Sequence, residues 1–117
     1  MGILRTKRSD RRYRKLIAAG LLENDGCKLC QEIVIKKFKH WKILKTRFPW
    51  DRIAKVHHMI VPIRHITFEQ LNRAEKKEYE IIKESYIQKN YETIAESTNK
   101  TKTIPTHFHL HLIVIKD

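Results

Sequence analysis

The chain has 117 residues and a mass of 14.1 kDa, the size of one ordinary domain. It contains no apolar run near the ~18 residues that span a bilayer, and its basic N-terminus lacks an apolar leader, so we expect a cytoplasmic protein that makes no membrane contact. A formal net charge of +12 predicts attraction to polyanions, although the same charge also fits solubility and loose association with nucleic acid.

Residues 1–24 differ in composition from the rest, and we interpret them as a basic helical arm attached to a domain of residues 25–117. The pattern predicts a helix from about Asp10 to Ala19, with Ser9 as its N-cap and Gly20 as its C-terminal stop. A solvated face is the commoner use of such a charge block, and a grip on nucleic acid is the alternative. The basic residues are Arg5, Lys7, Arg8, Arg11, Arg12, Arg14 and Lys15.

The two cysteines of the chain follow the arm as Cys27-Lys-Leu-Cys30. In a reducing cytosol this spacing indicates a metal site or a redox pair rather than a structural disulfide. Both alternatives remain open from the spacing alone.

Three segments rich in β-branched and aromatic residues predict strands. They are Ile33–Ile35, Phe38–Leu44 and Val56–Ile66, with Arg47–Asp51 as a turn broken by Pro49. Because proline cannot donate a ladder hydrogen bond, Pro62 marks an edge, a bulge or the end of the third strand.

The next element is predicted to be one long helix from Phe68 to about Ala95, capped by Thr67. An apolar stripe on this helix is expected to face a sheet. The stripe consists of Leu71, Ala74, Ile82 and Tyr86. A polar connection of residues 97–106 follows, and the last strand begins near His107. Strands flanking one long helix indicate an α+β domain with a mostly antiparallel sheet.

The last predicted strand carries histidine at every second position, in "HFHLHLIV" (His107–Val114). In a strand, alternate residues share a face, so the three imidazoles should point one way and the intervening apolar residues into the core. The simplest alternative is a solvated strand face. Imidazole serves as a nucleophile, acid or base near neutral pH. A rigid row of imidazoles suits a phosphoryl centre, where catalysis depends mainly on positioning and charge neutralisation.

The histidine segment and two segments upstream of it resemble those of a known family. "HFHLHLI" is similar to the signature of the histidine triad (HIT) superfamily of nucleotide hydrolases and transferases. The segment "HHMIVPIRHI" (His57–Ile66) resembles the family strand that ends in Pro-Lys-x-His-Ile, and Cys27-Lys-Leu-Cys30 lies where zinc-binding members carry Cys-x-x-Cys. The resemblance covers the chain from about residue 27 to its end. It implies a HIT-like antiparallel sheet of about five strands with one long helix, here preceded by the short basic helix.

The resemblance also implies catalytic roles. His109 corresponds to the nucleophile that attacks the α-phosphorus and forms a nucleotidyl-histidine intermediate. His111 corresponds to the residue that binds the phosphate oxygens, and His57 to the histidine that orients the triad.

In zinc-bearing relatives, the matching positions form a structural metal site. Those positions are Cys27, Cys30, His65 and His107, a donor set typical of closed tetrahedral zinc. Family members are commonly homodimers, so the resemblance implies a homodimer as well.

The segment before the triad departs from the family pattern, since Lys102–Thr106 replaces the usual phosphate-contacting residues. Thr103 and Thr106 of this segment, together with His107 of the triad, are the candidate substrate-binding residues. The chain also ends soon after the triad, which predicts an open pocket or one completed by the basic arm.

The expected substrate is a nucleotide or a nucleotide conjugate. Two other functions compete with this one. The first is removal of a nucleotide from adenylated nucleic-acid ends gripped by the arm, where affinity would fall steeply with salt. The second is a non-catalytic, zinc-stabilised module that binds nucleotides or nucleic acid.

Overall fold

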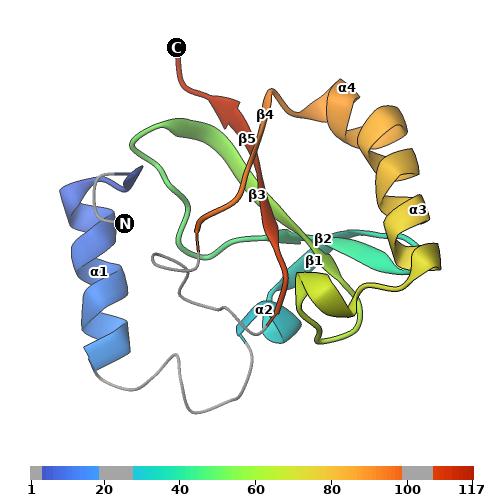
Figure 1. The fold of residues 1–117 in the computed structure, drawn as a ribbon. Helices are drawn as coiled ribbons and strands as arrows, with labels where there is room; N and C mark the ends of the chain where they lie inside the picture. The colour runs from blue at the N-terminus through green and yellow to red at the C-terminus, as the bar shows by residue number, and fades with distance from the viewer. Residues whose placement is uncertain (1–3, 19–27, 99–106) are drawn as a thin grey trace.

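A five-stranded antiparallel sheet organises the chain (Figure 1). The computed structural model describes residues 4–18, 28–98 and 107–117. The strands lie in the order β1-β2-β3-β5-β4, so the C-terminal strand is inserted between β3 and β4. They are β1 (Ile33–Lys37), β2 (Trp41–Lys45), β3 (Ala54–Pro62), β4 (Thr93–Ala95) and β5 (Leu110–Ile115). The predicted α+β class with an antiparallel sheet of about five strands is confirmed.

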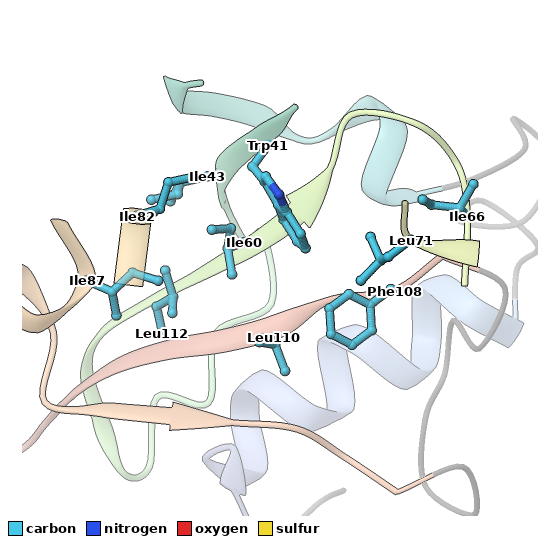
Figure 2. Close-up of a cluster of buried hydrophobic side chains, with 10 residues drawn as sticks. All are labelled: Trp41, Ile43, Ile60, Ile66, Leu71, Ile82, Ile87, Phe108, Leu110 and Leu112. Atoms are coloured by element: carbon cyan, nitrogen blue, oxygen red, sulfur yellow. The ribbon is translucent and has the colours of Figure 1, made fainter. Parts of the chain in front are cut away.

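One face of the sheet carries the main hydrophobic core, which alternate residues of the strands build (Figure 2). Phe108, Leu110 and Leu112 all point into it, as the period-two pattern predicts. The other buried members are Trp41, Ile43, Ile60, Ile66, Leu71, Ile82 and Ile87. Because successive side chains alternate between faces, this arrangement leaves the histidines for the opposite face.

A helical segment covers the core face, but it is shorter and less regular than the sequence predicts. It consists of the 3-10 turn η2 (Phe68–Gln70), α3 (Arg73–Ile82), the π-helical segment η3 (Lys83–Ile87) and α4 (Gln88–Asn90). The predicted helix to about Ala95 is therefore wrong at its end, because residues 93–95 form strand β4 and pair with β5.

The start of this segment also differs. Thr67 precedes only the short turn η2, whereas Asn72 caps α3 by accepting a hydrogen bond from the Glu75 backbone N–H at 2.8 Å. Ala74 of the predicted stripe is exposed, and Glu75 is buried in its place. The reason is that Glu75 is held by polar partners that the apolar pattern does not reveal.

Those partners tie α3 to the sheet. The Glu75 carboxylate accepts hydrogen bonds from Arg64 Nε at 3.0 Å and Arg64 Nη2 at 2.6 Å, and its backbone carbonyl accepts one from Trp41 Nε1 at 2.8 Å. The hydrogen bond from Arg64 lowers the pKa of the Glu75 carboxyl below its usual value. This buried carboxylate therefore remains ionised in the folded protein at neutral pH.

The basic arm forms helix α1 (Lys7–Ala18), close to the predicted range. Ser9 is not its cap, because it lies inside the helix and donates its backbone N–H to Thr6 Oγ1 at 3.2 Å. Thr6 is thus the capping residue, while Gly20 lies outside the described residues. Thr6 also anchors the arm, since its backbone N–H donates to Asp51 Oδ1 at 2.8 Å.

The strand boundaries shift by a few residues from the predicted ones. Residues 38–40 form a turn rather than strand, because the Phe38 N–H bonds the Trp41 carbonyl across it at 2.7 Å. Strand β3 ends at Pro62 and not at the predicted Ile66, so of the three alternatives for this proline the structure has the end of the strand. Strand β5 begins at Leu110, so residues 107–109 precede it outside the ladder. No helix among the described residues is long and apolar enough to cross a membrane.

Candidate functional site

Four histidine side chains are buried on the sheet face opposite the main core. They are His57 on β3, His111 on β5, and His107 and His109 just before β5. They divide into two groups. His57, His109 and His111 gather around a cavity, whereas His107 lies against His65 with ring centroids 4.7 Å apart.

A chain of hydrogen bonds fixes the tautomers of His57 and His111. The backbone N–H of Trp50 donates to His57 Nδ1 at 2.9 Å, so the proton of His57 lies on Nε2. That Nε2–H then donates to His111 Nδ1 at 2.8 Å, which places the proton of His111 on its own Nε2. His111 is therefore arranged as a hydrogen-bond donor through Nε2.

Burial keeps this pair neutral. It lowers the pKa of His57 to about 4, with a smaller contribution from the positive charge of Arg5. The pKa of His111 is lowered for the same main reason, and the neighbouring His57 adds to the effect. Both rings are thus uncharged near neutral pH, which the hydrogen-bond chain requires.

His109 is held in the opposite tautomer. Its Nδ1 lies 3.0 Å from the backbone carbonyl of His107, and because a carbonyl can only accept, the proton lies on Nδ1. The lone pair of the ring is then on Nε2. His109 and His111 lie edge to face with ring centroids 5.2 Å apart, so one ring offers a lone pair and its neighbour a proton.

Trp50 completes this arrangement, although no sequence pattern marks it as a site residue. Its indole packs against His111 with centroids 4.1 Å apart and against His57 with centroids 4.7 Å apart. Trp50 lies in the turn predicted at Arg47–Asp51, where no periodicity indicates which side chains are buried. Its aromatic character is the one sequence signal that points to packing.

The cavity in front of these histidines has a volume of about 70 Å³. This is below the ~300–1,000 Å³ of typical small-molecule pockets. It suits a group of phosphoryl size and is short of a whole nucleotide. The arm contributes two of its lining residues, Arg5 and Tyr13. The other lining residues are Leu29, Glu32, Thr46, Arg47, Phe48, Trp50, His57, Met59, His109 and His111.

A second cluster, formed by Cys30, His65 and His107, can hold a metal ion. Cys30 lies on the short helix α2 (Lys28–Gln31), and its Sγ is 3.6 Å from Nδ1 of His65 and 3.6 Å from Nδ1 of His107. His107 Nε2 donates to the Pro62 carbonyl at 3.0 Å, which leaves its Nδ1 with the lone pair on the sulfur side. The ligand atoms of the three residues all lie within 4.8 Å of one another.

The remaining predicted site residues have different positions. Cys27, Thr103 and Thr106 lie outside the described residues. His107, expected both at a metal and at the substrate, has its ring in the metal-type cluster and is not among the described residues that line the cavity. His58 and His40, for which the pattern gives no role, stand apart from both groups, and His58 Nδ1 pairs with the Tyr91 hydroxyl at 2.7 Å.

Comparison with solved structures finds proteins of related shape. A protein named "Hit Like Protein" aligns with 83% of this chain and 95% of its own, with 16% sequence identity and a TM-score of 0.49. No protein-family model matches the chain, and no curated protein matches it.

Proposed function

We propose that the protein cleaves or transfers a nucleoside monophosphate through attack of His109 on the α-phosphorus of a nucleotide or nucleotide conjugate. The observation that carries this proposal is the pair of opposite tautomers at one cavity. His109 holds a lone pair on Nε2, and His111 holds a proton on Nε2. A phosphoryl group between them meets a nucleophile and a hydrogen-bond donor.

The reaction proceeds in two displacements. The lone pair of His109 Nε2 forms a P–N bond while the bond from phosphorus to the leaving group breaks, and the leaving group departs with its electron pair and takes a proton from solvent. Water or another acceptor then attacks the phosphorus and releases its proton to solvent, and the P–N bond breaks with its electron pair returning to His109 Nε2. His111 donates to a phosphoryl oxygen throughout, and His57 keeps His111 in the donating tautomer.

The His107 carbonyl holds the reacting ring through Nδ1, the ring nitrogen that does not attack. The His107 carbonyl accepts from Nδ1–H of His109, and this hydrogen bond strengthens as the ring gains positive charge on bonding to phosphorus, because Nδ1–H then becomes a stronger donor. The neutral His57–His111 pair avoids a buried positive charge beside the developing one. The geometry therefore favours attack by His109 over attack by His111.

The deciding experiment is capture of the covalent intermediate. Wild-type protein mixed with an adenylyl phosphoramidate and quenched in base should gain the mass of one adenylyl group on the peptide containing His109. His109→Ala should gain none and lose at least about 10³-fold of the turnover. His40→Ala, which removes a histidine outside the site, should behave as wild type. Turnover by His109→Ala at the wild-type rate, with no adduct in either protein, would sink the proposal.

We further propose that the cluster of Cys30, His65 and His107 binds zinc, with Cys27 as the fourth ligand. A tetrahedral zinc ion with bonds of about 2.3 Å to sulfur and about 2.0 Å to nitrogen places these atoms about 3.5 Å apart. Both observed sulfur–nitrogen distances are 3.6 Å, so the described residues fit the ion. A closed site of this kind supplies folding stability rather than activated water.

A further inference from the structure

Arg5 reaches the cavity from the N-terminal arm, outside the region that resembles the histidine triad family. Its side chain is only 11% exposed, and its Nε donates to the Phe48 carbonyl at 3.1 Å. The guanidinium lies over the ring of Tyr13, 4.3 Å from its centroid. Arginine is thus held in one place at the cavity by a hydrogen bond and an aromatic face.

Among the described residues that line the cavity, none cancels the charge of Arg5. The other charged lining residues are Arg47 and Glu32, and these pair with each other at 2.8 Å. Asp10 approaches Arg5 to 4.0 Å but makes its closer ion pair with Arg14 at 2.7 Å. The described lining therefore has a net positive charge that comes from the arm.

The guanidinium also acts on the catalytic imidazoles through space. Its charge contributes to lowering the pKa of both His57 and His111, which places it within electrostatic reach of the reacting centre. An anion in the cavity would lie near both this positive charge and His111, since Arg5 and His111 both line it.

We infer that Arg5 binds the phosphate of the substrate and makes the cavity selective for phosphorylated ligands. Its Nε is engaged with Phe48 and its Nη1 lies 4.0 Å from Asp10, so the terminal nitrogens are the donors that Arg5 can offer to a phosphate in the cavity it lines. This role rests on the proposed function, because it takes the cavity before His109 as the phosphoryl site. The arm is then part of the substrate pocket and not a separate basic appendage.

Titration calorimetry of the full chain with AMP and with adenosine tests the inference, because the two probes differ only by the phosphate. Wild-type protein should bind AMP more tightly than adenosine. Arg5→Ala should weaken AMP binding at least about tenfold and leave adenosine binding within about twofold, since charge-assisted hydrogen bonds act on the phosphate alone. The AMP affinity of Arg5→Lys should fall between those of wild type and Arg5→Ala. Arg73→Ala, which removes the same charge at the exposed start of α3, should match wild type.

Asp51→Ala removes the acceptor that anchors Thr6, so the AMP and adenosine affinities of this variant show the effect of a loosened arm that still carries Arg5. Loss of AMP and adenosine binding by the same factor in Arg5→Ala would show that Arg5 only holds the arm, and would overturn the inference. Wild-type protein without preference for AMP over adenosine would also overturn it.

The inference and the proposed function fail in different ways. An Arg5-dependent preference for AMP, in a protein that forms no adduct on His109, would support phosphate binding and remove the catalytic role. An adduct on His109 that forms equally well in Arg5→Ala, with unchanged AMP binding, would support the catalytic role of His109 and remove phosphate binding by Arg5.

Discussion

At the scale of single residues, the buried neutral state of His57 links the site to protein stability. The folded protein holds the pKa of His57 at about 4, against about 6.5 in the unfolded chain, mainly because of burial. The unfolded state therefore takes up the proton first as the pH falls. The stability that the neutral ring contributes is complete above pH ~6.5 and is lost progressively down to pH ~4.

This linkage predicts that the free energy of unfolding of the wild-type protein falls by about 3 kcal/mol more than that of His57→Gln between pH 6.5 and pH 4. The glutamine amide can donate toward His111 without titrating. Urea unfolding curves at several pH values measure the difference, and comparing two proteins with the same metal ligands cancels the titration of those ligands. Parallel pH profiles for the two proteins would contradict the expected burial of a neutral ring.

The sheet face on which each side chain of the last strand lies could be predicted from the sequence, but the tautomers of the histidines could not. The period of two assigned Phe108, Leu110 and Leu112 to the core because each apolar residue must leave water. The tautomers depend on the Trp50 N–H and on the carbonyl groups of His107 and Pro62. The Pro62 carbonyl is far in sequence from His107, and the Trp50 N–H lies in the predicted turn before His57. In neither case does a sequence pattern indicate the direction of the backbone group.

At the scale of elements, the ion pair between Arg64 and Glu75 holds α3 on the sheet. Glu75 is 1% exposed and its carboxylate also accepts the Asn72 backbone N–H at 2.9 Å, so three donors meet one side chain. Replacing Glu75 by Gln keeps the shape and removes the charge that Arg64 requires. Because Arg64 is half exposed and can turn to water, we expect a loss of about 1–3 kcal/mol in the free energy of unfolding.

Glu84→Gln is the matched control, since it makes the same substitution at an exposed position of the same helical segment. It should change the free energy of unfolding by less than about 0.5 kcal/mol. Chemical denaturation of both variants at pH 7 measures the two values. Equal stability of Glu75→Gln and wild type would show that the buried carboxylate does not anchor the helix.

The same elements show why the predicted long helix was wrong. Apolar residues at helical spacing continue through the segment, but Asn72 caps a new helix after η2, and the chain leaves helix at Tyr91 to pair with β5. Residues 93–95 are a strand because β5 offers an unpaired edge there. Helix propensity describes the local chain alone, and tertiary pairing overrides it.

At the scale of the whole molecule, the sheet separates two tasks between its faces. Ile60, Leu110 and Leu112 pack against α3 and η3 on one face, while His57 and His111 lie on the other face beside the arm. The sequence could predict this division from alternation in one strand. It could not predict that the arm turns back over the histidine face, because the docking contacts of Thr6 and Arg5 with residues 48–51 span more than forty positions of sequence.

Removal of metal should separate stability from chemistry in the whole protein. The cluster of Cys30, His65 and His107 joins α2 to the segment after β3 and to the segment just before β5, so a bound ion closes long loops of the chain. Structural zinc contributes up to on the order of 10 kcal/mol of folding free energy. Cys30→Ser should therefore purify without stoichiometric metal and unfold at lower denaturant concentration than wild type.

Elemental analysis and urea unfolding, each with and without a strong chelator, measure this effect. The chelator should lower the midpoint of wild type and of His40→Ala and leave that of Cys30→Ser unchanged. Because the cluster is not part of the cavity lining, Cys30→Ser kept at a temperature where it remains folded should still form the adduct on His109. Wild-type protein that carries no metal and keeps its urea midpoint of unfolding in chelator would contradict the proposed metal site, since the fold would then hold these three side chains together without an ion.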